Sequence, residues 1–135
     1  MVARIHLDPT RPAITHRVEI IDPEQGIFDF YIIVGLYEDG RPGELFLKMG
    51  KAGSTLRGLL DTIGVETSLL LQYGIPLNIL SKKLAGVCFG PSGRTNDPDI
   101  PKCTSVVDYI FRWMEQKFGS KDSKEKDAKN ELSNS

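Results

Sequence analysis

From residue 15 to residue 49, runs of β-branched or alternating apolar side chains are separated by turn residues, a pattern typical of β-strands. Residues 15–21 (THRVEII) are rich in β-branched side chains, and residues 22–26 (DPEQG) have the composition of a turn. In residues 28–37 both faces of the predicted strand are largely apolar, which favours an interior place in a sheet. One face carries Phe30, Ile32, Val34 and Leu36, and the other carries Tyr31, Ile33 and Tyr37.

Residues 38–43 (EDGRPG) predict a hairpin connection, because Asp39-Gly40 tolerates the positive φ angles of a tight turn. Residues 44–49 (ELFLKM) then predict the return strand. Gly35, inside the preceding strand, predicts a bulge or a close backbone contact. Three strands joined by short turns predict an antiparallel meander.

After Gly53 the apolar positions recur at steps of three and four, which predicts a helix of about five turns. Its predicted apolar stripe consists of Leu56, Leu59, Leu60, Ile63, Thr67, Leu70 and Leu71. Ser54 or Thr55 is the predicted N-cap, because either hydroxyl can accept a hydrogen bond from a backbone N–H of the first turn. Gly74 is the predicted C-cap glycine, followed by Pro76.

A second helix is predicted over residues 77–84, ending at Gly86. Residues 87–103 contain several glycines and prolines and predict a long irregular loop.

The last helix is predicted to start near Thr104 or Ser105, where Ser105 and Asp108 have the spacing of a capping box. Its apolar stripe consists of Val107, Ile110, Phe111, Met114 and Phe118, and Gly119 is predicted to close it.

These elements predict an α+β fold, a small antiparallel sheet (three-stranded meander) with three helices packed on one face. The predicted domain spans residues 14–119. Residues 1–13 are predicted to be a flexible N-terminal arm, and residues 120–135 a disordered polar tail, because neither end has an apolar stripe.

Composition and charge narrow the possible functions. The 135 residues fit one domain, and the net charge of -1 gives no general attraction to nucleic acid or to an anionic membrane. The aromatic residues near Trp113 have no basic cluster around them, so nucleic-acid binding is not predicted. Trp113 is expected either to cover the edge of the core or to meet a partner. No apolar run approaches the roughly 20 residues that span a bilayer, and the N-terminus lacks a signal-peptide core. The predicted location is therefore the cytoplasm.

Cysteine and histidine are scarce. Cys88 and Cys103 are too far apart in sequence for a CxxC pair, and the only histidines are His6 and His16. We predict no metal site and no catalytic residue. A redox role for Cys88 or Cys103 stays open beside the favoured interpretation, a structural thiol.

Residues 47–60 (LKMGKAGSTLRGLL) combine glycine, lysine and hydroxyl residues at the foot of the predicted helix. A nucleotide-binding P-loop requires GxxxxGK followed by Ser or Thr, but Leu45 replaces the first glycine and Ala52 the hydroxyl. The favoured interpretation is a tight turn and a helix cap. The alternative is an anion bound at the helix N-terminus, and its candidate residues are Gly50, Lys51, Gly53, Ser54 and Thr55.

Several longer blocks make the chain similar to a known family. They are ITH, VGLYEDGRPGELFLKMGKAGSTLRGLLD, LLLQYGIPL, FGPSGRTNDPDI and SVVDYIFRWM, between Ile14 and Met114. With these blocks the chain resembles the TSCPD domain family, and in particular the C-terminal segment of adenosylcobalamin-dependent (class II) ribonucleotide reductases. It differs from the TSCPD signature in that Cys103 precedes Thr104-Ser105 rather than following it.

The resemblance implies a role in deoxyribonucleotide synthesis for DNA replication. In the resembling enzymes a large barrel binds adenosylcobalamin and carries the radical chemistry, and 135 residues leave no room for it. The expected function is therefore an accessory or separated C-terminal domain of a ribonucleoside-diphosphate reductase. Its expected partner is the catalytic subunit or domain, and the chain itself is expected to bind no cofactor. The alternatives are a stand-alone nucleotide- or anion-binding regulatory module, or a ligand-free oligomerisation domain that acts by self-association.

Overall fold

The computed structural model describes residues 3–50 and 53–119. Its strands and first two helices are β1 (Ala13–Asp22), β2 (Gly26–Leu36), β3 (Pro42–Met49), α1 (Ser54–Gln72), α2 (Leu77–Leu84), β4 (Gly93–Thr95) and β5 (Lys102–Cys103). A last helix covers residues 106–119. The strands form one antiparallel sheet in the order β3-β2-β1-β4-β5. The α+β class and the meander of β1, β2 and β3 are confirmed, but the sheet has five strands and the prediction of three was wrong.

The two missed strands lie inside the predicted loop of residues 87–103. β4 pairs with β1 through Ile20 opposite Thr95 and Ile21 opposite Arg94. Gly93 makes this pairing possible, because a Cβ there would lie only 2.0 Å from the Ile21 carbonyl oxygen. Both strands are too short to show a sequence period, and they are defined only by the pairing of β4 with β1 and of β5 with β4.

The meander follows its predicted turns. Gly40, in the β2–β3 connection, has φ of 89°, a backbone conformation that residues with a Cβ rarely adopt. The β2–β3 register shifts between Gly35 and Leu36, and a Cβ on Gly35 would collide with the Glu44 side chain. The predicted interruption of the strand at Gly35, a bulge or a close contact, is therefore confirmed as a register shift.

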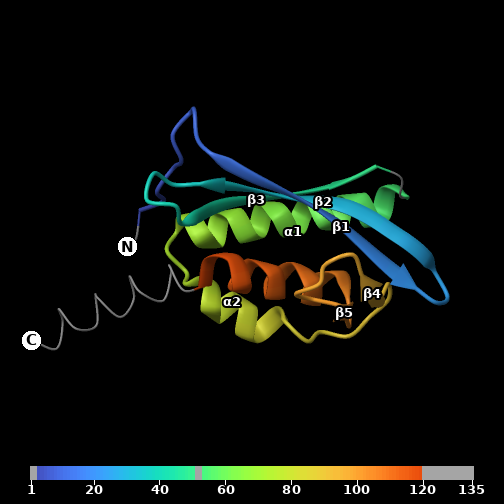
Figure 1. Ribbon diagram of the computed structural model, residues 1–135. Helices are drawn as coiled ribbons and strands as arrows, with labels where there is room; N and C mark the ends of the chain where they lie inside the picture. Colours follow the sequence, from blue (N-terminus) through green and yellow to red (C-terminus); the bar gives the residue numbers. More distant parts are fainter. Residues whose placement is uncertain (1–2, 51–52, 120–135) are drawn as a thin grey trace, which may run out of the picture.

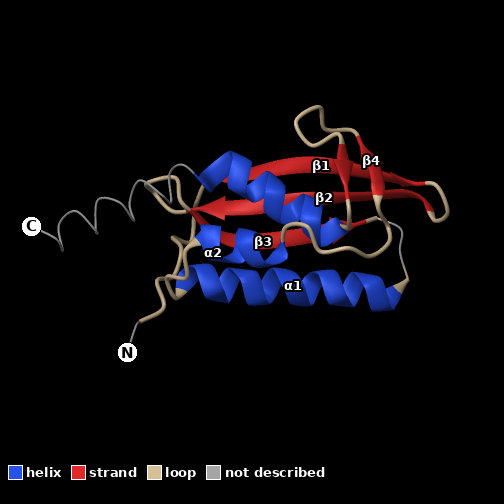
Figure 2. Cartoon of the chain, turned by 90° about the horizontal axis from the view of Figure 1, so that it is seen from below, coloured by secondary structure: helices blue, strands red, loops and turns tan. Residues whose placement is uncertain are grey.

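All three helices lie on one side of the sheet, as predicted (Figure 1). Seen from below, α1 lies along β3 at one edge of the molecule, whereas the helix of residues 106–119 lies under β1 and β2 (Figure 2). β2 is an interior strand, as predicted. Phe30, Ile32 and Val34 are buried against the helices, but Tyr31 on the opposite face is 43% exposed.

The start of α1 differs from the prediction. Gly53 occupies the N-cap in an extended conformation, and its carbonyl accepts the first helical hydrogen bond, from the Arg57 N–H at 3.2 Å. Ser54 is therefore already the first helical residue, and the prediction of Ser54 or Thr55 as N-cap was wrong. The chain enters the helix one residue earlier than a serine cap requires.

The end of α1 follows the prediction. Gly74 has φ of +90°, and its N–H donates to the Leu71 carbonyl at 3.0 Å. The Ile75 N–H donates to the Leu70 carbonyl at 3.0 Å, which completes a Schellman motif.

The buried stripe of α1 is narrower than predicted. Leu60, Thr67 and Leu71 are buried, but Leu59 is 57% and Leu70 40% exposed. Because α1 lies at the sheet edge, its core-facing arc excludes these two leucines, and placing them in the core stripe was wrong.

The helix of residues 106–119 is capped by Ser105, whose Oγ accepts the Asp108 N–H at 2.9 Å. The Asp108 carboxylate does not complete the reciprocal capping box. It accepts instead from the N–H groups of Thr104 (2.9 Å) and Gly86 (2.6 Å). Ser105 is thus confirmed as the cap, and Asp108 ties the end of α2 to the start of this helix.

The two ends of the chain were predicted to be mobile. Residues 3–12 have no regular secondary structure, but the Arg11 guanidinium binds the Glu44 carboxylate (2.8 Å from Nη2 to Oε2). The flexibility of the arm stays a prediction, and the predicted tail of residues 120–135 lies outside the described residues.

Candidate functional site

The predicted anion-binding turn connects β3 to α1. Gly50 directly follows β3, Gly53 caps α1, and Ser54 and Thr55 are exposed in its first turn. Lys51 lies outside the described residues. The first turn of α1 contains no acidic side chain, so no carboxylate of its own opposes an anion there. β3 precedes these residues and α1 follows them, as predicted, and anion binding stays a prediction.

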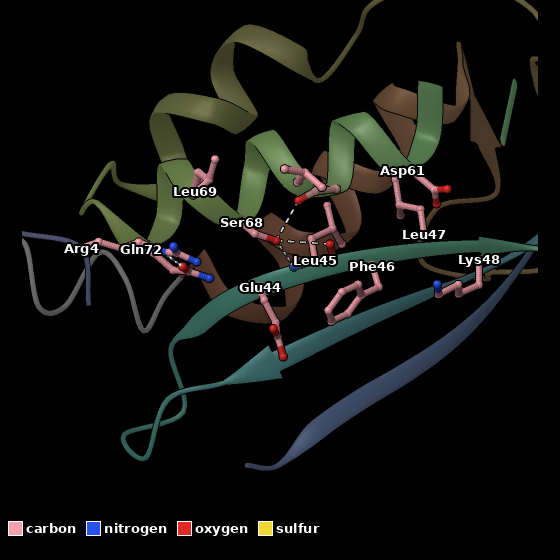
Figure 3. A pocket seen from close by; sticks show the side chains of 12 residues that line it. Arg4, Glu44, Leu45, Phe46, Leu47, Lys48, Asp61, Ser68, Leu69 and Gln72 are labelled. Carbon is pink, nitrogen blue, oxygen red and sulfur yellow. Dashed lines mark hydrogen bonds between the residues drawn. The ribbon is translucent and has the colours of Figure 1, made fainter. Parts of the chain in front are cut away.

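A groove of about 380 Å³ runs between α1 and the outer edge of β3 (Figure 3). Ser68 points from α1 to the strand, where its Oγ accepts the Leu45 N–H at 2.8 Å and donates to the Gly64 carbonyl at 2.7 Å. The Gln72 amide donates to the Gly43 carbonyl at 2.9 Å. Side chains of α1 thus satisfy edge groups that would otherwise attract a foreign strand.

Gly64 sets how closely α1 approaches β3. A Cβ on Gly64 would lie 2.8 Å from the Leu45 carbonyl oxygen. Glu44 and Phe46, which alternate with Leu45 along the strand, point away from α1 to the open face of the sheet (Figure 3). The absence of a side chain at Gly64 therefore allows the close approach of α1 to β3.

The N-terminal segment is anchored to the last residue of α1. The Arg4 guanidinium donates to Gln72 Oε1 at 2.6 Å, and the Ile5 N–H donates to the Gln72 carbonyl at 2.9 Å. Gln72, only 5% exposed, joins this segment, α1 and β3.

A polar cluster that the sequence did not predict lies between β1 and the helix of residues 106–119. The Tyr109 hydroxyl donates to Asp97 Oδ2 at 2.8 Å and lies 2.7 Å from His16 Nε2. The His16 ring stacks on Trp113, with 4.8 Å between ring centroids. Because the hydroxyl proton is directed to Asp97, His16 donates through Nε2–H and keeps Nδ1 as an acceptor.

Burial dominates the electrostatics of this cluster. Burial lowers the pKa of His16 below its ordinary value, although the Asp97 carboxylate opposes the shift. Burial and the bond to Asp97 raise the pKa of Tyr109 far above its ordinary value. His16 is therefore neutral at pH 7 and Tyr109 keeps its proton.

A hollow of about 360 Å³ lies beside the cluster, lined by both His16 and Asp97. His16, Asp97 and Tyr109 each come from a different resembling block, ITH, FGPSGRTNDPDI and SVVDYIFRWM. Membership of these blocks was the one sequence signal that could have singled them out. Their polar atoms pair with one another, so the cluster joins β1, the loop before β5 and the last helix.

Both cysteines are free, and they line the same hollow of about 680 Å³. Cys88 is exposed, whereas Cys103 is buried, and burial raises the pKa of its thiol. A raised pKa makes Cys103 a weak nucleophile. No group of three or more His, Cys, Asp or Glu residues within 3–50 and 53–119 could hold a metal ion.

The TSCPD domain family model matches residues 9–118 of the chain. The chain belongs to the TSCPD domain family. The match covers the meander, the helices and the β4–β5 pair, and it contains the cluster of His16, Asp97 and Tyr109.

Named relatives are vitamin B12-dependent ribonucleotide reductases. The enzyme of Rhodopirellula baltica is 44% identical over 111 residues, which are 82% of this TSCPD chain and 10% of the relative. The enzyme of Streptomyces avermitilis is 40% identical over 115 residues, 85% of the chain and 11% of the relative. The enzyme of Streptantibioticus cattleyicolor is also 40% identical over 115 residues, which are 85% of the chain and 18% of the relative. The chain thus spans between about a tenth and a fifth of these relatives, and no solved structure matches it.

No helix in the described ranges of the TSCPD chain is long and apolar enough to cross a membrane.

Proposed function

We propose that this TSCPD chain is an accessory domain of a vitamin B12-dependent ribonucleotide reductase. It acts through contacts with the catalytic part of the enzyme and does not itself carry the radical chemistry. The observation that carries the proposal is the match of 82–85% of the chain to 10–11% of such reductases. The domain therefore serves deoxyribonucleotide synthesis, and we expect it in the cytoplasm.

The interior polar groups support a structural role. Asp108 is only 2% exposed, and its carboxylate binds two backbone N–H groups. His16, Tyr109 and Asp97 bind one another. In both sets the hydrogen bonds join separate elements of the fold.

The described hollows do not fit adenosylcobalamin, which supplies radical chemistry when it is bound to an enzyme. Their volumes of about 360 to 680 Å³ are typical of pockets for drug-sized ligands, which have about 300–1,000 Å³. A cobalamin is considerably larger than such ligands. We therefore assign the cofactor to the catalytic part of the reductase.

Affinity capture followed by an activity assay tests the proposal. The immobilised chain is exposed to an extract of the cells that make it, and mass spectrometry of the retained proteins is expected to identify a ribonucleotide reductase. Deoxyribonucleotide formation by that purified reductase is then measured with and without added chain, and we expect the chain to change it. The pure chain, given adenosylcobalamin, a ribonucleotide and a dithiol, is expected to form no product. Turnover by the pure chain, or no retention of a reductase, would refute the proposal.

A further inference from the structure

Exposed large apolar side chains gather on α1, the following turn and α2. We call this set the outer α1–α2 surface. It consists of Leu59, Val65, Leu69, Leu70, Tyr73, Ile75 and Ile79, which are 37–60% exposed. Soluble domains rarely expose so many large apolar side chains within one short stretch unless the surface meets a partner.

The geometry of α1 places its exposed apolar side chains on one arc. At 100° per residue, the positions from Val65 through Leu69 to Leu70 cover roughly 140° of the helix. Val65 and Leu69, at one end of this arc, also line the groove between α1 and β3. Glu66 is the one charged residue within that arc. The 19-residue helix contains only two other charged residues, Arg57 and Asp61. A helix that is apolar on its outer side as well as its inner side is typical of one buried on both sides.

The open face of the sheet offers a contrast. Four large apolar side chains are exposed there, between 42% and 70%, namely Ile21, Ile27, Tyr31 and Phe46. However, Arg17 on the same face binds both Glu19 (2.8 Å) and Asp29 (3.0 Å). This face therefore carries an ion-pair network that suits contact with water, whereas the arc on α1 does not.

We propose that the outer α1–α2 surface docks on the catalytic part of a vitamin B12-dependent ribonucleotide reductase. This inference rests on the proposed function and names the surface that performs it. The occupant follows from the relatives, in which the matching segment is 10–11% of one longer polypeptide. The rest of that polypeptide is tethered beside the segment at high effective concentration, so a second copy is not needed to cover the surface.

Single lysine substitutions on the two faces test the surface. Val65→Lys and Leu69→Lys place a charge within the arc, and lysine is a good helix former at exposed positions. Ile27→Lys is the matched control on the open sheet face. Thermal melting first checks that all three variants fold as the wild type does. Binding of the full 135-residue chain to the purified reductase is then measured by calorimetry. We expect the dissociation constant to rise at least about tenfold for each α1 variant and less than about twofold for Ile27→Lys.

Each other outcome overturns the inference in a different way. If the wild type binds and the α1 variants bind equally well, the surface is wrong although the proposed function stands. If the wild-type chain does not bind the reductase, the proposed function and the surface both fall. Light scattering tests whether the chain instead forms a dimer through this surface. A wild-type dimer that Val65→Lys dissociates, with reductase affinity unchanged, would show that a second copy occupies this surface.

Discussion

The Tyr109 hydroxyl lies 2.7 Å from Nε2 of His16, a residue 93 positions away in the chain. This contact joins the middle of β1 to the last helix, and the same hydroxyl binds Asp97 in the loop before β5. Tyr109 is fully buried, so neither of its partners can be replaced by water without opening the core. One hydroxyl thereby holds three segments that are distant in sequence.

Replacing Tyr109 by Phe keeps the ring and removes only this hydroxyl. The Asp97 carboxylate, 10% exposed, and His16 Nε2 both lose a partner. We expect Tyr109→Phe to lower the free energy of unfolding by about 1–3 kcal/mol, measured by urea denaturation. The control is Tyr31→Phe, which is exposed on the open sheet face and should change stability by less than about 0.5 kcal/mol. Equal effects of the two variants would contradict a joining role for Tyr109.

Two glycines in α1 give opposite expectations for the same substitution. Gly58→Ala adds a methyl group in open space on an exposed turn and should stabilise the domain by about 0.5–1 kcal/mol. Gly64→Ala places Cβ 2.8 Å from the Leu45 carbonyl oxygen, and α1 must move away from β3. We expect a destabilisation of about 1–3 kcal/mol that exceeds the gain in helix propensity. Thermal denaturation of both variants decides the matter, and stabilisation by Gly64→Ala would show that the helix and strand are not in close contact.

Acid should weaken the tie made by Asp108. Burial alone would raise the pKa of this carboxyl, but the N–H groups of Thr104 and Gly86 and the charge of Arg112 outweigh burial, and its pKa lies below the ordinary 3.8. As the pH falls, the unfolded chain therefore takes up the proton first. The stabilisation by this carboxylate is fully present well above pH 3.8 and is lost as the pH falls through 3.8 toward the lower pKa of the folded state.

Comparing the wild type with Asp108→Asn isolates this effect. The amide cannot accept from both backbone N–H groups, so the variant should be less stable at pH 6 by about 1–3 kcal/mol. Its further loss of stability between pH 4 and pH 3 should be smaller than that of the wild type, because it has no carboxylate at position 108. A smaller loss remains in both proteins, because Asp22, whose pKa is also lowered by backbone hydrogen bonds, titrates in both. Urea denaturation at these pH values provides the measurement. Parallel pH curves for the two proteins would assign the acid sensitivity to other groups.

The turn of residues 50–55 gives a last prediction. Gly53 is the cap of α1 and Ser54 is exposed, so Ser54→Ala should change stability by less than about 0.5 kcal/mol. We expect a nucleoside triphosphate to leave the melting temperature unchanged. If the turn did bind an anion, a ligand at one hundred times its dissociation constant would add about 2.7 kcal/mol. Lys51→Ala should then remove most of that gain, and thermal scans with and without the triphosphate distinguish the two results.

Local physical chemistry was enough to predict much of this fold from sequence. The period of two in residues 28–37 predicted β2, and the period of three to four after Gly53 predicted α1, because each period follows from the backbone geometry of a single element. Gly40 and Gly74 marked a turn and a helix end, since both adopt positive φ angles that other residues resist. The Ser105 cap was predictable for a similar reason, because the cap bond spans only three residues.

Tertiary structure alone decided the rest. β4 exists because β1 lies beside residues 93–95, and β5 exists because it pairs with β4. Strands of two or three residues have no period to detect. Helical spacing alone could not show that Leu59 and Leu70 face outward, because the core-facing arc depends on where α1 lies against β3. For the same reason, the meeting of His16, Asp97 and Tyr109 was not predictable from spacing. These residues lie on three separate elements, and only the packing of the last helix against the sheet brings their polar atoms within hydrogen-bonding distance.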